Sequence, residues 1–182
     1  MNIIPTPINN CLIIEPKVFH DERGYFFESF NNVVFTNETG IEVSFIQDNQ
    51  SLSTKGVLRG LHYQRGEFQQ AKLVRVIEGE VLDVVVDLRK DSNSYGKTFT
   101  QTLSDTNFKQ VYIPRGCAHG FLVKSDRAIF AYKCDNLYNK ESEGGILYND
   151  PFLNIDWEYD LDKVIVSDKD KILPLFENAL PL

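Results

Sequence analysis

The stretch KLVRVIEGEVLDVVVDL, residues 72–88, holds two runs rich in β-branched residues on either side of a Glu-Gly pair. Such runs favour strands, and a glycine between them is typical of a tight turn. The stretch therefore predicts a hairpin made of Lys72–Val76 and Val81–Leu88. With a two-residue turn, Lys72 and Asp83 would lie diagonally on one face of the sheet.

Shorter runs of the same kind recur along the chain, separated by Gly and Pro. They predict further strands at 43–49, 57–64, 98–103, 110–113, 120–123 and 128–134. Short helices are expected at 33–36 and 168–171. No repeat or linker divides the 182 residues, so we expect a single all-β domain over residues 1–182, a sandwich or barrel with a few short helices.

The composition excludes several classes of protein. A hydrophobic content of 42% indicates a packed core, and a net charge of −7 argues against a nucleic-acid partner. We expect no membrane span and no leader. Cys11, Cys117 and Cys134 are odd in number and lack CxxC spacing, which predicts packed, reduced thiols in a cytoplasmic protein. Cys117 is a poor candidate nucleophile because buried cysteines are usually inert.

Two of the three histidines lie in polar segments, RGLHYQ (59–64) and PRGCAH (114–119), with Lys72 between them. Histidine accepts protons near neutral pH, and lysine can stabilise the oxyanion that forms when a carbon beside a carbonyl is deprotonated. The pattern therefore suits proton abstraction next to a carbonyl. Taken alone, His62 could equally be a structural histidine bonded to a backbone carbonyl.

The geometry of the first segment depends on Gly60. Arg59 and His62 are an odd number of positions apart, so a regular strand would send them to opposite faces. A bulge at Gly60 would bring both into one cavity. Lys72 and Asp83 could be an exposed ion pair of little consequence, or an important one on a concave face.

Tyr132 follows Ala128 and Phe130 at strand spacing. Core packing with a satisfied hydroxyl is one interpretation of this pattern. The other is a phenol that acts as a general acid.

A metal site is disfavoured by the donor set. Small β-barrels that bind a transition ion use several converging imidazoles and a carboxylate. Here the first segment reads His62-Tyr63-Gln64, without a His-x-His pair, and His20 lies apart in a polar turn. The sequence predicts acid–base chemistry without a metal.

Seven segments, spread over nearly the whole chain, carry a resemblance to a known family. They are DERGYFFE (21–28), FIQDN (45–49), VLRGLHYQ (57–64), KLVR (72–75), IPRGCAHGF (113–121), YNDP (148–151) and SDKD (167–170). With them the chain resembles the dTDP-4-dehydrorhamnose 3,5-epimerases, metal-free cupins of nucleotide-sugar metabolism. The resemblance implies a cupin-type jelly roll that uses no cofactor and epimerises dTDP-4-keto-6-deoxyglucose at C3 and C5 to dTDP-4-keto-L-rhamnose.

The resemblance also implies roles for individual residues. His62 matches the family's general base, Asp170 the aspartate that holds it, and Tyr132 the general acid on the opposite face of the sugar. Lys72 matches the group that faces the C4 oxygen, where it would stabilise an enolate without transferring a proton. A second buried polar pair is matched by His119 and Asp83.

Other positions match the family's contacts with the nucleotide sugar. They are Arg23, Glu28, Gln47, Asp48, Asn49, Arg59, Tyr138, Glu143 and Lys169. Among them Arg59 matches a residue that holds the diphosphate, and Tyr138 the residue that stacks on thymine. In the family the segment 23–26 crosses to a partner subunit, so the resemblance implies a homodimer that exchanges N-terminal strands.

Three alternatives stay open. An epimerase restricted to C3, or one for another 4-keto-deoxy nucleotide sugar, would carry the same base and lysine. A non-catalytic sugar-nucleotide binding cupin would not need a base and an acid on opposite faces of its ligand. A metal-dependent cupin oxygenase would need the missing His-x-His pair.

Overall fold

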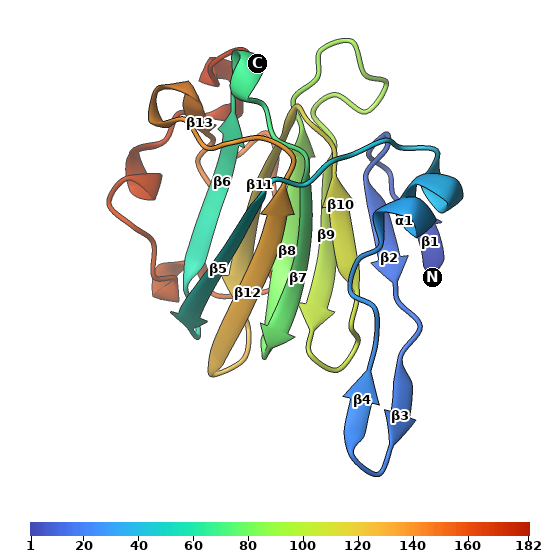
Figure 1. Cartoon of the computed structure of the whole chain (residues 1–182). Helices are drawn as coiled ribbons and strands as arrows, with labels where there is room; N and C mark the ends of the chain where they lie inside the picture. Colours follow the sequence, from blue (N-terminus) through green and yellow to red (C-terminus); the bar gives the residue numbers. More distant parts are fainter.

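Two antiparallel sheets face each other in the computed structural model, which describes all 182 residues (Figure 1). In spatial order the first sheet is β1 (Asn2–Pro5), β2 (Leu12–Glu15), β10 (Gln110–Ile113), β7 (Lys72–Glu78), β12 (Arg127–Cys134) and β5 (Gln47–Thr54). The second is β13 (Glu143–Gly145), β6 (Leu58–Gln64), β11 (Cys117–Val123), β8 (Glu80–Asp87) and β9 (Thr98–Ser104). A separate hairpin joins β3 (Phe19–Asp21) to β4 (Gly24–Phe26). The prediction of an all-β sandwich is confirmed.

The helices are few and short, as predicted. The single α-helix is α1 (Asn32–Thr39), which Asn31 caps by accepting a hydrogen bond from the backbone N–H of Val34. The 3₁₀ turns are Gly66–Phe68, Lys140–Ser142, Leu161–Lys163, Asp170–Ile172 and Phe176–Asn178. No helix is long and apolar enough to cross a membrane.

The predicted hairpin at residues 72–88 is wrong. β7 pairs with β10 and β12, whereas β8 pairs with β11 and β9 in the other sheet. Gly79 has φ +84°, and a Cβ there would lie 2.1 Å from the carbonyl oxygen of Arg127. The chain bends at this glycine and passes from one sheet to the other. A strand, a glycine and a second strand give the same sequence signal for both arrangements.

The predicted sharing of one face by the two strands nevertheless holds, because the inner faces of the two sheets meet. Val74 and Val76 of β7 pack with Val81 and Val85 of β8 in the core between the sheets. The outer face of β8 is also buried, under the C-terminal segment that carries Trp157. Burial of both faces explains the nearly unbroken run of apolar residues in this strand.

The other predicted strands are present with shifted ends. β10 has the predicted bounds, β9 and β12 differ by one residue, and β11 begins three residues earlier than expected. β5 runs over Gln47–Thr54 instead of 43–49, because Val43 and Phe45 pack beside α1 in a separate cluster. The expected C-terminal helix is a single 3₁₀ turn, Asp170–Ile172. The strands β1 to β4 and β13 have no counterpart among the predicted strands.

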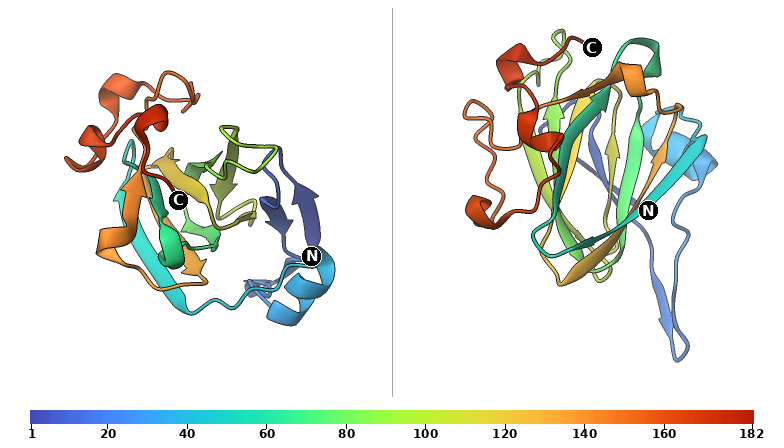
Figure 2. Two further views of the ribbon diagram at one scale, coloured as in Figure 1. Left: turned by 90° about the horizontal axis from the view of Figure 1, so that it is seen from above. Right: turned by 90° about the vertical axis from the view of Figure 1, so that its left-hand side faces the viewer.

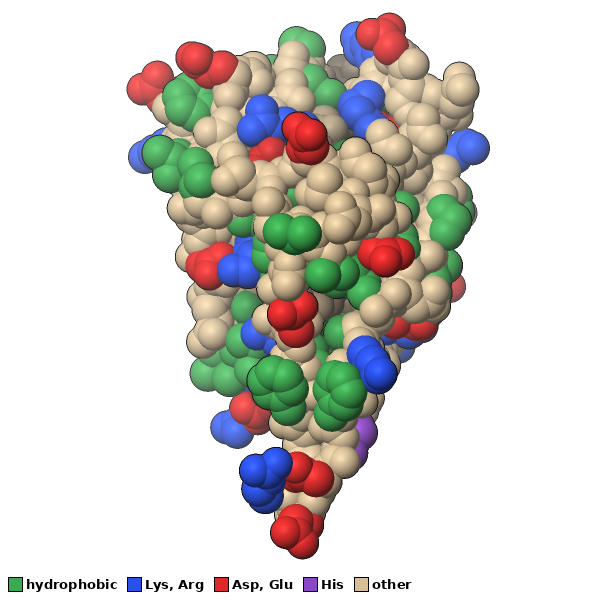
Figure 3. Space-filling model, turned by 45° about the vertical axis from the view of Figure 1, so that its right-hand side comes forward, with side chains coloured by type: hydrophobic (Ala, Val, Ile, Leu, Met, Phe, Trp, Pro, Cys, Tyr) green, Lys and Arg blue, Asp and Glu red, His purple; other side chains and the backbone are tan.

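The β3–β4 hairpin extends away from the body of the molecule (Figure 2, right). Phe19, Tyr25 and Phe26 on it are exposed. The space-filling view shows hydrophobic side chains above a charged tip on this tapering projection (Figure 3). Exposed aromatic side chains on a projecting hairpin are typical of a surface that contacts another chain.

Candidate active site

A cavity of about 670 Å³ opens between the two sheets. Strands β5, β6, β7, β11 and β12 and the segment 165–170 contribute to its wall. The segment 165–170 reaches the cavity because Ile165 bridges to Val57, just before β6. The predicted site residues that line the cavity are Asn49, Arg59, His62, Lys72, His119, Tyr132, Lys169 and Asp170.

A β-bulge turns Arg59 and His62 into this cavity, as the sequence predicts. His62 pairs with His119 and Arg59 with Phe121, so Gly60 and Leu61 on β6 together oppose the single residue Gly120 on β11. Gly60 has φ +118°, and a Cβ on it would lie 2.6 Å from the Cα of Gly120. The bulge therefore requires glycine at position 60.

His62 and Asp170 form a hydrogen-bonded pair with 2.7 Å between Nε2 and Oδ1. His62 is 32% exposed and faces the cavity, whereas Asp170 is buried and also accepts a hydrogen bond from the N–H of Gly60. Burial alone would raise the pKa of Asp170, but the hydrogen bonds from His62 and Gly60 bring it below its ordinary value. An ionised Asp170 holds the proton on Nε2, which leaves Nδ1 of His62 free to accept one.

Tyr132 lies on β12, in the sheet opposite His62. Burial raises the pKa of its hydroxyl, so the phenol stays protonated at neutral pH and can donate a proton. A ring-shaped ligand between the sheets would have His62 on one face and Tyr132 on the other.

Lys72 points into the cavity with its Nζ 5.8 Å from the centre of the Tyr132 ring. No hydrogen bond or ion pair holds this ammonium group. The side chain is partly exposed because the cavity is open, yet desolvation of the ammonium lowers the pKa of Lys72. A cation with unused donors inside a cavity is well suited to stabilise a developing oxyanion.

His119 and Asp83 form a second pair, with 2.6 Å between Nε2 and Oδ2. Both are buried, and the imidazole stacks on Phe130 with 5.9 Å between ring centres. His119 lies directly across the β6–β11 ladder from His62. Two imidazoles, each tied to an aspartate, therefore sit side by side on one wall.

A network of polar side chains lies next to the cavity. The Tyr138 hydroxyl donates to Glu143 (3.0 Å), which also pairs with Lys169. The backbone N–H of Tyr138 donates to the side chain of Gln47 (3.1 Å). Four predicted binding residues are thus brought together beside the catalytic candidates.

Three predicted binding residues belong neither to the cavity wall nor to this network. The carboxylate of Asp48 pairs with Lys133 (2.9 Å) and does not line the cavity. Arg23 lies at the turn of the projecting hairpin, where it pairs with Asp21. Glu28 follows the same hairpin and is not among the residues that line the cavity.

The family model described as dTDP-4-dehydrorhamnose 3,5-epimerase matches residues 5–178. The chain belongs to the dTDP-4-dehydrorhamnose 3,5-epimerase family. The family's enzyme from Escherichia coli K12 is 53% identical over 182 residues, which cover 100% of this chain and 98% of that protein.

Solved structures agree with membership in the dTDP-4-dehydrorhamnose 3,5-epimerase family. The dTDP-6-deoxy-D-glucose-3,5-epimerase of Legionella pneumophila, in complex with dTDP-4-keto-L-rhamnose, is 49% identical with a TM-score of 0.93, covering 97% of this chain and 93% of that chain. A 3′-monoepimerase from Streptomyces bikiniensis, in complex with dTDP-quinovose, is 32% identical with a TM-score of 0.88, covering 94% and 86%. The protein is an isomerase of the epimerase family with its cupin-like jelly-roll fold.

Sequence reasoning missed residues that support this epimerase-family site. The hydroxyl of Ser53, on β5, accepts a hydrogen bond from Nε of Arg59 (3.0 Å), and the hydroxyl of Ser167 accepts one from the backbone N–H of Asp170 (3.2 Å). Cys134 is the cross-strand partner of Lys72. The contacts of Ser53 and Cys134 depend on how the strands pair, which has no marker in one sequence.

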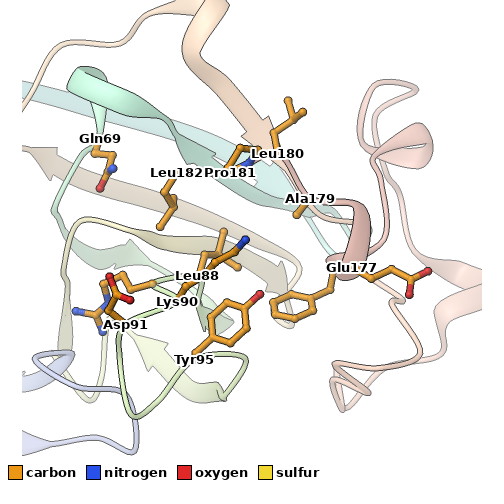
Figure 4. A pocket seen from close by; sticks show the side chains of 12 residues that line it. Gln69, Leu88, Lys90, Asp91, Tyr95, Glu177, Ala179, Leu180, Pro181 and Leu182 are labelled. Atoms are coloured by element: carbon orange, nitrogen blue, oxygen red, sulfur yellow. The ribbon is translucent and has the colours of Figure 1, made fainter.

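A second hollow, of about 410 Å³, lies between the C-terminal tail and the segment 88–95 (Figure 4). Of the two cations on its wall, Arg89 is already paired with Asp87 and Lys90 is exposed, and the aromatic side chains Tyr95 and Phe176 contact each other. Several of the predicted site residues line the cavity between the sheets, and no predicted site residue lines this second hollow.

Proposed function

We propose that the protein inverts C3 and C5 of dTDP-4-keto-6-deoxyglucose through an enolate, giving dTDP-4-keto-L-rhamnose. The observation that carries the proposal is the oriented His62–Asp170 pair, which faces Tyr132 across a cavity that also holds Lys72. Hydrogens at C3 and C5 are acidic because both carbons adjoin the C4 ketone. The same base can therefore serve both centres.

In the first step Nδ1 of His62 takes the proton from the carbon, the electron pair of the C–H bond forms a C=C bond to C4, and the π pair of the C4 carbonyl moves to its oxygen. Lys72 stabilises this oxyanion by charge and hydrogen bonding and keeps its own protons. Tyr132 then donates its proton to the opposite face of the carbon, and the carbonyl reforms. Base and acid on opposite sheets make each cycle an inversion, and each such group typically contributes about 10²–10⁴-fold.

We assign binding of the nucleotide to the rim of the cavity. In this proposal Arg59 and Lys169 neutralise the diphosphate, and the hydrogen bond from Arg59 to Ser53 and the presence of both cations on the cavity wall support it. Tyr138 offers an exposed ring for stacking on the base. In this assignment Asn49 contacts the sugar nucleotide from inside the cavity, and Gln47 and Glu143 contact it from the rim.

We further propose that the active form is a homodimer in which the β3–β4 hairpin reaches the partner subunit. Arg23 and Glu28 would then contact substrate in the partner's cavity. This would explain why neither residue lines the cavity of its own subunit. The exposed aromatic residues of the hairpin support this proposal. Its test is the mass in solution of Phe26→Asp beside the control Phe152→Asp, since both phenylalanines are 71% exposed. We expect a monomer for the first and a dimer for the second, and a dimeric Phe26→Asp would contradict the proposal.

We propose a cytoplasmic enzyme that needs no cofactor or metal and has no nucleic-acid partner. The three cysteines are free and buried, which fits a reducing compartment. No group of three or more His, Cys, Asp or Glu side chains is arranged to hold a metal ion. Activity that survives dialysis against a chelator would support metal independence, and activity restored by one added metal would refute it.

An epimerase restricted to C3 is the second candidate, because the S. bikiniensis relative is a 3′-monoepimerase. Product analysis separates the two reactions. We expect Tyr132→Phe to lose product formation by about 10²-fold or more. Tyr112→Phe is the matched control, since Tyr112 is a buried tyrosine that lies outside the cavity, whereas Tyr132 is partly buried and lines it. Full product formation by Tyr132→Phe would refute its role as acid.

A further inference from the structure

One carboxylate oxygen in the interior of the protein has no partner. Asp83 is 1% exposed, and its Oδ2 receives the hydrogen bond from His119, but its Oδ1 is buried and makes no hydrogen bond. In the other pair both oxygens of Asp170 are engaged, by His62 and by Gly60. A buried carboxylate oxygen without a partner is costly, so a compensating charge is expected nearby.

The side chain that can compensate this oxygen is Lys72. It lies on β7, on the sheet that faces Asp83, and its ammonium also lacks a partner. Asp83 acts on Lys72 through space and opposes the effect of burial. An unpartnered anion and an unpartnered cation thus face the same interior region from opposite sheets.

The other groups around Lys72 are less suited to balance its charge. Those that share the cavity with it or act on it are Cys134 and Tyr132 on β12, His62 and Arg59 on β6, His119 on β11, Glu143 on β13, and Lys169 and Asp170 of the segment 165–170. Asp170 is engaged by His62 and Gly60. Cys134 as a thiolate would favour the ammonium most, but burial raises the pKa of this thiol to about 11, so it is neutral at physiological pH. Glu143 acts more weakly than Asp83 and is paired with Lys169. Asp83 is therefore the principal anion that acts on Lys72.

We propose that Asp83 is a positioning residue that, clamped by His119, keeps the ammonium of Lys72 charged and aimed at the C4 oxygen of the substrate. This inference rests on the proposed function. Asp83 does not touch the reacting atoms and exchanges no proton in the cycle. Its charge preserves the cation that the enolate needs, in a cavity whose desolvation favours the neutral amine.

Asp83 could act on Lys72 by its charge, as proposed, or it could be purely structural and act only by holding His119. Two variants separate these two roles. Asp83→Asn removes the charge with little change of shape, while His119→Gln removes the imidazole and keeps the carboxylate. The readout is the titration of Lys72 in the ligand-free protein, followed by ¹³C NMR of labelled lysine and assigned with Lys72→Gln. It does not depend on turnover.

In Asp83→Asn we expect the titration midpoint of Lys72 to fall by about one pH unit or more, the usual effect of an opposite charge at close range. The basic limb of the kcat/KM profile should move down by a similar amount, with activity recovering as the pH is lowered towards the acid limb. In His119→Gln the midpoint should stay close to that of the wild type. An unchanged midpoint in Asp83→Asn, or an equal fall in both variants, would overturn the proposal.

Two further arrangements keep the test decisive. If Asp83→Asn does not fold, Asp83→Ser, which is smaller and also neutral, carries the same expectation. A lowered Lys72 midpoint in Asp83→Asn, together with a wild-type protein that turns over no substrate, would refute the proposed function and leave the effect of Asp83 on Lys72 intact. Normal turnover by the wild type with an unshifted Lys72 midpoint in Asp83→Asn would refute only the effect of Asp83 on Lys72.

Discussion

Gly79 is the point at which the chain passes from one sheet to the other, and Gly79→Ala tests how strictly that bend is determined. The residue has φ +84°, a region that costs an L-residue about 1–2 kcal/mol. An added Cβ would lie 2.1 Å from the Arg127 carbonyl oxygen and 2.5 Å from the Ser125 hydroxyl, so the neighbouring turn must shift. Overpacking of this kind costs about 1–3 kcal/mol. The free energy of unfolding should therefore fall by about 2–5 kcal/mol in total.

Gly66→Ala provides the matched control. Gly66 also has a positive φ, +58°, but nothing lies within 4 Å of its Cβ position, so only the backbone cost applies. Urea unfolding followed by circular dichroism should show Gly79→Ala to be about 1–3 kcal/mol less stable than Gly66→Ala. Equal stability of the two variants would refute the steric reasoning for the bend.

Three further predictions concern the site and the core. Asp170→Asn should lower kcat by about 10²-fold or more with little change in KM, because Asp170 acts on the base rather than on substrate binding; a rise in KM at unchanged kcat would contradict this. Burial alone would raise the pKa of Asp87, but hydrogen bonds from Arg89 and two serines bring it below the ordinary 3.8. The stability that ionised Asp87 contributes is then complete above pH 3.8 and is lost as the pH falls through the lowered pKa. Asp87→Asn should therefore lower the free energy of unfolding by about 3–5 kcal/mol at pH 7, and urea unfolding should show a flatter dependence of this free energy on acid pH. Parallel pH dependences in the variant and the wild type would exclude this role. Burial raises the pKa of Cys11 to about 12, so the folded protein should resist thiol reagents at pH 8 and react in urea, whereas rapid labelling of the native state would contradict the packing.

The fold class could be predicted from the sequence because alternating β-branched runs report burial directly. The partner of each strand could not, since the run at 72–88 fits both a hairpin and a bend between sheets. The decisive fact is the carbonyl oxygen of Arg127 beside Gly79, and it comes from a segment about fifty residues away. The N-terminal strands β1 to β4 are three or four residues long, too short to show a period.

The site was predictable where a local feature fixes it. The odd spacing of Arg59 and His62 around Gly60 requires a bulge if both are to share a cavity, and the bulge is there. Asp170 is more than a hundred residues from His62 and reaches it through the bridge between Val57 and Ile165. Only the family resemblance could indicate that contact in advance. Asp83 was expected on the same face of one sheet as Lys72. Instead the two residues lie on different sheets, whose inner faces pack against each other.

The central claim is that His62 removes hydrogens beside the C4 ketone. NMR of dTDP-4-keto-6-deoxyglucose with the protein in deuterated water measures this directly, at C3 and C5 separately. We predict exchange at both centres with the wild type and none above background with His62→Ala, while ligand affinity stays within about tenfold because the base acts mainly in the transition state. Exchange at C3 alone would make the protein a single-centre epimerase. Undiminished exchange with His62→Ala would contradict the account.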